Sequence, residues 1–239
     1  MKKLILFIAV CICSNLMAKS PSHEAWTALL KKNVSTKGIV NYKGFIKDSS
    51  ALNSYLKSIS ENTPDSKWSV NEQKTYWINA YNAFTVRLII RNYPIKSIND
   101  VPKGNAKSPW DIKFFKIGAT AFSLNMIEHE KLRKPFADAR IHFALVCASQ
   151  SCPILLNEAF EASKLDAQLD KQAKVFFADK SRNIITKNNA QISQLFDWYL
   201  TDFTTKGLTI IDFINQYAST KIDANAKISY LNYSWNLNE

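Results

Sequence analysis

Two cysteines stand five positions apart in RIHFALVCASQSCP, residues 140–153. A thiolate is a nucleophile, two thiols can form a disulfide, and thiolates bind metals, so Cys147 and Cys152 allow three kinds of site. A disulfide would close a six-residue loop and contribute about 2 kcal/mol of stability. Metal ligation is the least favoured, because a structural zinc site typically needs two close pairs of ligands. We therefore predict no metal and no cofactor.

A cysteine nucleophile needs a base, and two histidines are candidates. If residues 141–147 form a strand, His142 and Cys147 point to opposite faces and can pair only if the chain turns before Cys147. We therefore interpret His142 as a buried histidine whose hydrogen bonds are satisfied, or as a binding residue. His129 is the better base, because it lies beside Glu128 in the first turn of a short predicted helix, whose N-terminus favours a thiolate or an oxyanion.

Two amide side chains, Asn79 and Asn82, lie three residues apart on one face of a long apolar helix. Buried amides need hydrogen-bond partners, so they either pin neighbouring loops or orient a histidine and donate to an oxyanion. Glu128 is interpreted as a capping-box acid that can also bind a ligand. Arg140 and Ser151 are weaker candidates for binding an anionic group.

The elements that must position these groups follow from periodicity and capping patterns. We predict helices over 22–33, after Asp48, from Ser69 to Pro94, from Asn125 to Arg133, from Asn157 onward, and around 195–203 and 209–217. Hairpins are predicted at 114–124 and 183–193, and a half-buried strand at 231–237. The apolar run 141–147 indicates a buried central strand. The fold class is therefore α+β, a helix-rich single domain around a largely antiparallel sheet.

The first 18 residues have the three parts of a signal peptide: a basic start, an apolar run and a small residue at the end. We expect residues 19–239 to form one soluble, exported domain, periplasmic or secreted, with no transmembrane segment after the signal is removed. The net charge is +11, but the lysines are scattered without an aromatic stripe, so nucleic acid is excluded as a partner. An anionic cell-envelope component remains a candidate partner.

Several motifs occur together in one order: YWINAYNAF, FSLNMIEHEKLR, RIHFALVCASQSCP, LFDWYLTDF and YLNYSWNL. In this respect the chain resembles the domain of unknown function 547 family, from about Trp68 to residue 239. That family occurs in exported bacterial proteins and in plant proteins. It has no assigned reaction, so the resemblance implies no catalytic residues.

Three functions follow as hypotheses. The first is a cell-envelope scaffold or binding domain with a polar cluster around Cys147. The alternative is a thiol-dependent acyl hydrolase or transferase, with Cys147 as nucleophile, His129 as base, and Asn79 or Asn82 as orienting or oxyanion group. The second alternative is a metal-binding domain. We expect six side chains to converge in one cluster: Asn79, Asn82, Glu128, His129, His142 and Cys147.

Overall fold

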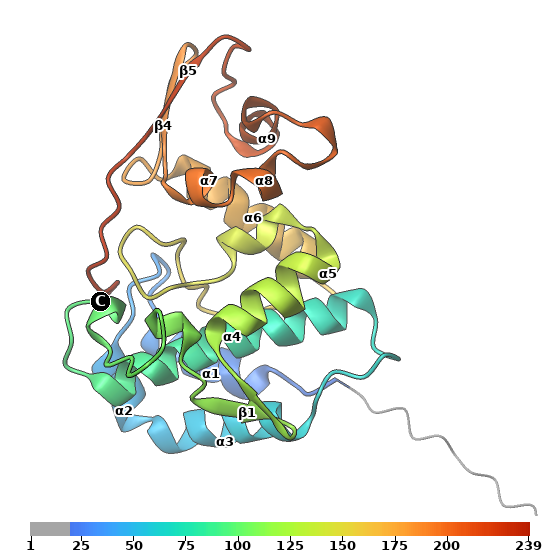
Figure 1. Cartoon of the computed structure of the whole chain (residues 1–239), viewed down its shortest axis with the longest axis vertical. Helices are drawn as coiled ribbons and strands as arrows, with labels where there is room; N and C mark the ends of the chain where they lie inside the picture. The colour runs from blue at the N-terminus through green and yellow to red at the C-terminus, as the bar shows by residue number, and fades with distance from the viewer. Residues whose placement is uncertain (1–19) are drawn as a thin grey trace, which may run out of the picture.

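The structure is a computed structural model that describes residues 20–239, so the predicted signal peptide lies outside the described residues. A helical body forms the lower half of the molecule in Figure 1. It consists of α1 (Glu24–Asn33), α2 (Tyr42–Lys47), α3 (Ser49–Glu61) and α4 (Val70–Asn92). The helix predicted from Ser69 is α4, and a capping box starts it: the Ser69 hydroxyl accepts from the Glu72 N–H, and the Glu72 carboxylate accepts from the Ser69 N–H. This long apolar helix is buried on nearly every side.

The segment after α4 contains two short 3-10 turns, η1 (Ile98–Asp100) and η2 (Pro109–Asp111). The first predicted hairpin follows, with β1 (Phe115–Ile117) antiparallel to β2 (Thr120–Phe122). Then comes η3 (Met126–Arg133), a π-helix continued by α5 (Lys134–Phe136). The predicted capping box at Asn125 and Glu128 is wrong. Ser123 accepts from the Met126 N–H instead, which leaves the Glu128 carboxylate free for other contacts.

The buried central strand predicted at 141–147 is also wrong. Residues Ala139–Phe143 form a 3-10 helix, η4, and the chain turns after it. The segment is as buried as predicted, because Ile141 and Ala144 enter one hydrophobic core while Phe143 enters a second. An apolar run therefore marked burial correctly but did not distinguish a buried turn from a buried strand.

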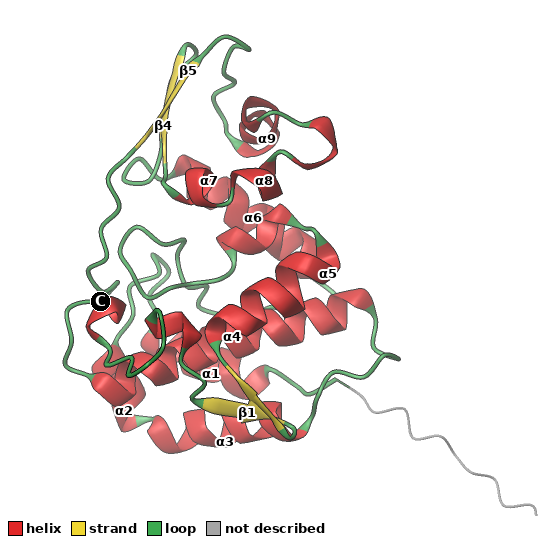
Figure 2. Cartoon of the chain, viewed as in Figure 1, coloured by secondary structure: helices red, strands yellow, loops and turns green. Residues whose placement is uncertain are grey.

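The second core lies in the upper half of the molecule (Figures 1 and 2). It is built on α6 (Leu165–Ala178), α7 (Leu195–Trp198), α8 (Leu200–Phe203), η5 (Thr205–Gly207) and α9 (Ile210–Tyr217). The helix predicted from Asn157 thus begins later, at Leu165. A small sheet pairs β3 (Ile184–Ile185) antiparallel to β4 (Asn189–Ile192), and β4 parallel to β5 (Lys227–Tyr230).

The strand predicted at 231–237 is wrong in position, since strand pairing stops at Tyr230. The residues after it run back as a tail to the helical body, where single bridges pair Ser97 with Asn236 and Ser149 with Leu237. The α+β class with small, mostly antiparallel sheets is confirmed over the described residues. Among the helices of residues 20–239, none is long and apolar enough to cross a membrane.

Candidate functional site

A cavity of about 210 Å³ lies where η3, the turn after η4, α7 and the tail meet. We call it the disulfide pocket. Its polar and sulfur-bearing walls are Glu128, His142, Cys147 and Cys152, and its aromatic walls include Trp110, Trp198, Tyr199, Tyr233 and Trp235. The pocket therefore combines three of the residues predicted to form a polar cluster with aromatic side chains from distant parts of the sequence.

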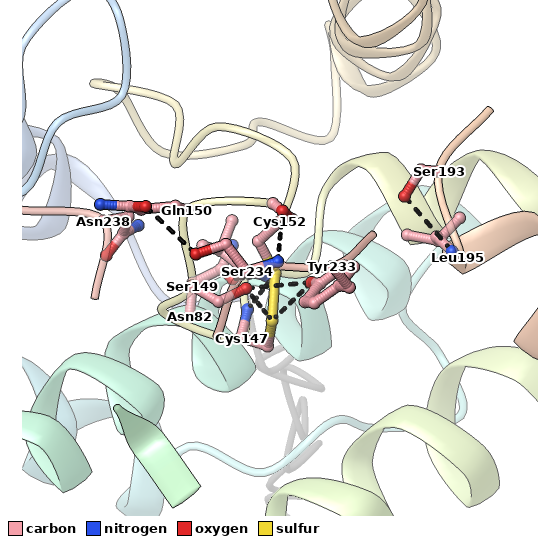
Figure 3. The surroundings of a disulfide bond; sticks show 12 residues. Asn82, Cys147, Ser149, Gln150, Cys152, Ser193, Leu195, Tyr233, Ser234 and Asn238 are labelled. Carbon is pink, nitrogen blue, oxygen red and sulfur yellow. Dashed lines mark hydrogen bonds between the residues drawn. A yellow bond between two sulfur atoms is a disulfide. The ribbon is translucent and has the colours of Figure 1, made fainter. Parts of the chain in front are cut away.

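The sulfur atoms of Cys147 and Cys152 form a disulfide, with 6.2 Å between the two Cα atoms (Figure 3). Cys147 is half-buried, whereas Cys152 is 3% exposed. Ala148, directly after Cys147, has a left-handed φ of 64°, which is uncommon for a residue other than glycine. The backbone N–H of Cys147 donates to Sγ of Cys152 over 2.8 Å. Of the three kinds of site that the cysteine spacing allowed, the structure contains the disulfide.

The loop closed by the disulfide is held from two sides. Arg182 donates to the backbone carbonyls of Gln150 and Cys152, each over 2.7 Å. On the other side, the Ser151 hydroxyl accepts from the N–H of Ser234 in the tail over 2.8 Å. Ser151 therefore joins the loop to the tail, and its hydroxyl is engaged in that contact.

A second polar group in the pocket is His142, whose Nε2 lies 2.7 Å from Oδ2 of Asp202. Arg133 donates to both oxygens of the same carboxylate, over 2.6 and 2.8 Å. Burial alone would raise the pKa of Asp202, but the hydrogen bonds from His142 and Arg133 outweigh it and hold that pKa well below its usual range. Asp202 is thus ionised, so Nε2 of His142 carries the proton of this hydrogen bond.

The third polar group is Glu128, which is 6% exposed. Burial, followed by the charge and hydrogen bond of Glu128, raises the pKa of Tyr199 far above its ordinary value. The ring of Tyr199 in turn packs against His142, with 4.0 Å between the ring centroids. Among the described residues, Glu128 has no ion-pair partner within 4.0 Å; Arg133, which is paired with Asp202, interacts with the charge of Glu128 only from further away. It is also the one formally charged side chain among the residues found to line the pocket.

Two hydroxyl groups face the sulfur of Cys147, as Figure 3 shows. The hydroxyls of Ser149 and Tyr233 each lie 3.2 Å from Sγ, and Ser149 donates to the Tyr233 oxygen over 3.0 Å. Burial raises the pKa of Tyr233 to about 12, so its hydroxyl is protonated at neutral pH and available as a donor.

The predicted cluster is only partly formed, because three of its six members are not among the residues that line the pocket. His129 is exposed, and its Nδ1 lies 3.0 Å from a guanidinium nitrogen of Arg133. Asn79 binds both the N–H and the carbonyl of Phe160, over 3.0 and 2.9 Å. Both amides therefore act as clamps on loops, because Asn82 likewise holds two backbone groups.

The Asn82 clamp holds the backbone between two residues of the pocket, His142 and Cys147. Its side chain donates to the carbonyl of Ala144 over 2.8 Å and accepts from the N–H of Val146 over 3.0 Å. It therefore fixes the turn that separates His142 from Cys147. Both polar ends of the amide are used in this contact, which leaves the role of oxyanion donor without support.

Arg140 is likewise engaged in the protein's own contacts. Its guanidinium donates to the carboxylates of Asp138, Asp166 and Asp170, over 2.8 to 2.9 Å. This arrangement neutralises the arginine and leaves it poorly suited to an external anion.

Sequence reasoning missed Asp202 and the aromatic walls of the pocket. The motif LFDWYLTDF offered one signal, an aspartate at the end of an apolar helix, but its partner His142 lies 60 positions away in the sequence. Trp198 is 47% exposed, so part of the aromatic wall is open to solvent.

No three His, Cys, Asp or Glu side chains within residues 20–239 are grouped as a metal site would need. No curated protein and no solved structure gives a significant match to the chain. Residues 66–177 match the model of the family described as "Protein of unknown function, DUF547". This segment contains α4, η3, the cysteine pair and most of α6. Over these residues the chain is similar to the DUF547 family, which confirms the resemblance seen in the sequence motifs.

Proposed function

We propose that the chain is an exported binding domain of the cell envelope, and that its disulfide pocket binds the amine-bearing end of a small ligand. The observation that carries this proposal is Glu128, a buried carboxylate without an ion pair among the described residues. A buried charge is costly unless a partner of opposite charge compensates it. An ammonium group in the pocket would supply that partner.

The aromatic walls favour the same class of ligand. Trp198 and Trp235 stack with 5.7 Å between centroids, and Tyr233 lies 4.6 Å from Trp235. Aromatic faces attract cations through the ring quadrupole, by about 0.5–2 kcal/mol for each contact. An anion would meet both these faces and Glu128, so anionic ligands are disfavoured inside the pocket. A volume of about 210 Å³ suits a small headgroup rather than a polymer.

Two further parts of the proposal rest on the sequence. The signal-peptide pattern supports export, and the net charge of +11, which becomes +9 when Lys2 and Lys3 leave with the signal peptide, supports attraction of the outer surface to anionic envelope polymers. The two contacts are distinguishable, because attraction between exposed charges weakens with salt much more than binding in a buried pocket does. Co-sedimentation with an anionic polymer at low and high salt tests the surface contact alone.

Calorimetric titration with choline tests the pocket, and the matched probe is 3,3-dimethylbutan-1-ol, which has the same shape without the charge. We expect choline to bind at least about 10-fold more tightly than the alcohol, a difference of about 1.4 kcal/mol. Glu128→Gln should abolish this preference, whereas Glu130→Gln, which removes an exposed charge two residues further along η3, should keep it. Equal binding of the two probes, or an unchanged preference in Glu128→Gln, would show the proposal to be wrong.

The alternative function, acyl transfer with Cys147 as nucleophile and His129 as base, gains no support from the geometry. His129 is exposed and contacts Arg133, and it is not among the residues that line the pocket. A different base, however, does lie in the pocket.

A further inference from the structure

We propose that reduction of the Cys147–Cys152 disulfide turns the disulfide pocket into an acyl-transfer site, with Cys147 as nucleophile and His142 as general base. The substrate class is a small carboxylic ester or thioester. The inference rests on the proposed function only in requiring that small molecules enter the pocket.

The first support is the course of the chain between the two residues. On a regular strand His142 and Cys147 would face opposite ways, but η4 ends at Phe143, the chain turns, and both side chains line the same cavity. Asn82 fixes this turn through the backbone of residues 144 and 146. The arrangement is thus a built feature of the fold, held by a buried amide.

The second support is the orientation of the imidazole. Asp202 accepts from Nε2 of His142, so in the neutral ring Nδ1 is unprotonated and can accept a proton. Within residues 20–239 the hydrogen bond found for this ring uses Nε2, and His142 lines the pocket, so Nδ1 is the ring nitrogen left to act as the base. Asp202 is a positioning residue: it fixes the tautomer and stabilises the imidazolium, as the third member of such sets does.

The third support is the environment of the sulfur. The hydroxyl of Tyr233, 3.2 Å from Sγ of Cys147, can donate to a thiolate at that position, while Ser149 donates its own proton to the Tyr233 oxygen and so orients it. Hydrogen bonds to the charged form favour it and lower the pKa of a thiol. Cys152 has a different role, because it is 3% exposed and receives the N–H of Cys147, so it serves as the partner that masks the nucleophile.

Activation requires a reductant, which we take to be a small thiol or dithiol. Its thiolate attacks one sulfur of the pair, and a second thiolate resolves the mixed disulfide. Cys147 and Cys152 each gain one electron and one proton, and the reductant leaves as a disulfide. Because Cys147 is the more exposed of the two and lines the pocket, its sulfur is the accessible point of attack.

The acyl transfer then needs no further reagent. His142 takes the thiol proton as Cys147 attacks the acyl carbonyl, and the proton passes to the leaving alcohol or thiol as the carbonyl–heteroatom bond breaks. This leaves a thioester on Cys147. Water attacks the thioester while His142 takes its proton, and the carboxylic acid and the free thiol are released.

The test measures two reactions of the full mature chain, alkylation by iodoacetamide and release of nitrophenol from p-nitrophenyl acetate. Oxidised wild type should be neither alkylated at Cys147 nor able to release nitrophenol through Cys147. Reduced wild type should be labelled at Cys147, and its rate should rise with pH through an inflection well below the ordinary thiol value of about 8.5. Cys152→Ser should react in the same way without reductant.

His142→Gln in the reduced protein should lower the rate of nitrophenol release at least about 100-fold, within the range general-base catalysis supplies. Asp202→Asn should move the inflection of the alkylation rate to higher pH, which a merely structural role would not do. His129→Gln separates the two candidate bases, and its rates should stay within about 2-fold of wild type.

The inference is overturned if reduced wild type and Cys152→Ser titrate like an ordinary thiol, or if His142→Gln keeps the wild-type rate. If Cys152→Ser and His142→Gln unfold, the pH profile of reduced wild type alone decides whether the inference holds.

A failure of this inference can be told apart from a failure of the proposed function. Choline binding is measured on the oxidised protein, and it depends on Glu128 rather than on Cys147.

Discussion

Replacing Asn82 by alanine removes an amide that satisfies two buried backbone groups, the carbonyl of Ala144 and the N–H of Val146. A buried polar group left without a partner costs about 1–3 kcal/mol. A water molecule that enters the vacated space can hydrogen-bond to one of the two groups and so reduce its free-energy cost. We therefore expect Asn82→Ala to lower the free energy of unfolding by about 3 kcal/mol.

Asn79→Ala is a matched control, because it lies one helical turn earlier on the same face of α4 and frees the N–H and carbonyl of Phe160. We expect a similar loss of stability, measured by urea unfolding followed by far-UV circular dichroism. The two variants should differ at the pocket. Asn82 fixes the turn between His142 and Cys147, so only Asn82→Ala should change the rate at which a phosphine reduces the disulfide.

Two results would refute this reasoning. A loss below about 0.5 kcal/mol for Asn82→Ala would mean that the freed groups find other partners, because an unsatisfied pair must cost more. Equal changes of the reduction rate in both variants would mean that the pocket responds to global stability, not to the local turn.

Burial lowers the pKa of His23 to about 4, below its unfolded value of about 6.5, so the neutral ring is favoured in the folded state. Stability should be fully present above pH 6.5 and fall by roughly 3 kcal/mol as the pH drops to 4, a slope that His23→Gln should remove in urea unfolding at several pH values. The disulfide closes a six-residue loop, so Cys147→Ser and Cys152→Ser should each lose about 2 kcal/mol, and reductant should destabilise wild type but neither variant. N-terminal sequencing of the exported chain should give Lys19 as the first residue, and an intact Met1 would exclude cleavage.

Helices were predictable wherever the pattern was local. The start of α4 after Ser69, its end before Pro94 and its apolar character depend on neighbours within a few positions, and the helix was predicted correctly. The capping box predicted at Asn125 failed because Ser123 competes for the cap. Residues 141–147 were misread since an apolar run reports burial, not backbone conformation.

The site was predictable only in its chemically distinctive members. Cys147, Glu128 and His142 were singled out, and all three line the pocket. Asp202 and Tyr233 were missed because long-range contacts across the fold bring them to the pocket, and a single sequence carries no record of such contacts. The roles of Asn79 and Asn82 were left open for the same reason, as their partners are backbone groups of distant loops.

The tail is synthesised last, so the pocket is completed only when the end of the chain has been made. A chain is made and exported from its N-terminus, at about 5–20 residues per second, and early segments can fold before later ones arrive. The helical body precedes the tail in this order, yet Tyr233 and Trp235 of the tail form walls of the pocket. The half-made protein can therefore bury its first core while the pocket still lacks these walls. The ligand binding that we propose would therefore require that the tail has docked beside Ser149, where Tyr233 also covers the sulfur of Cys147.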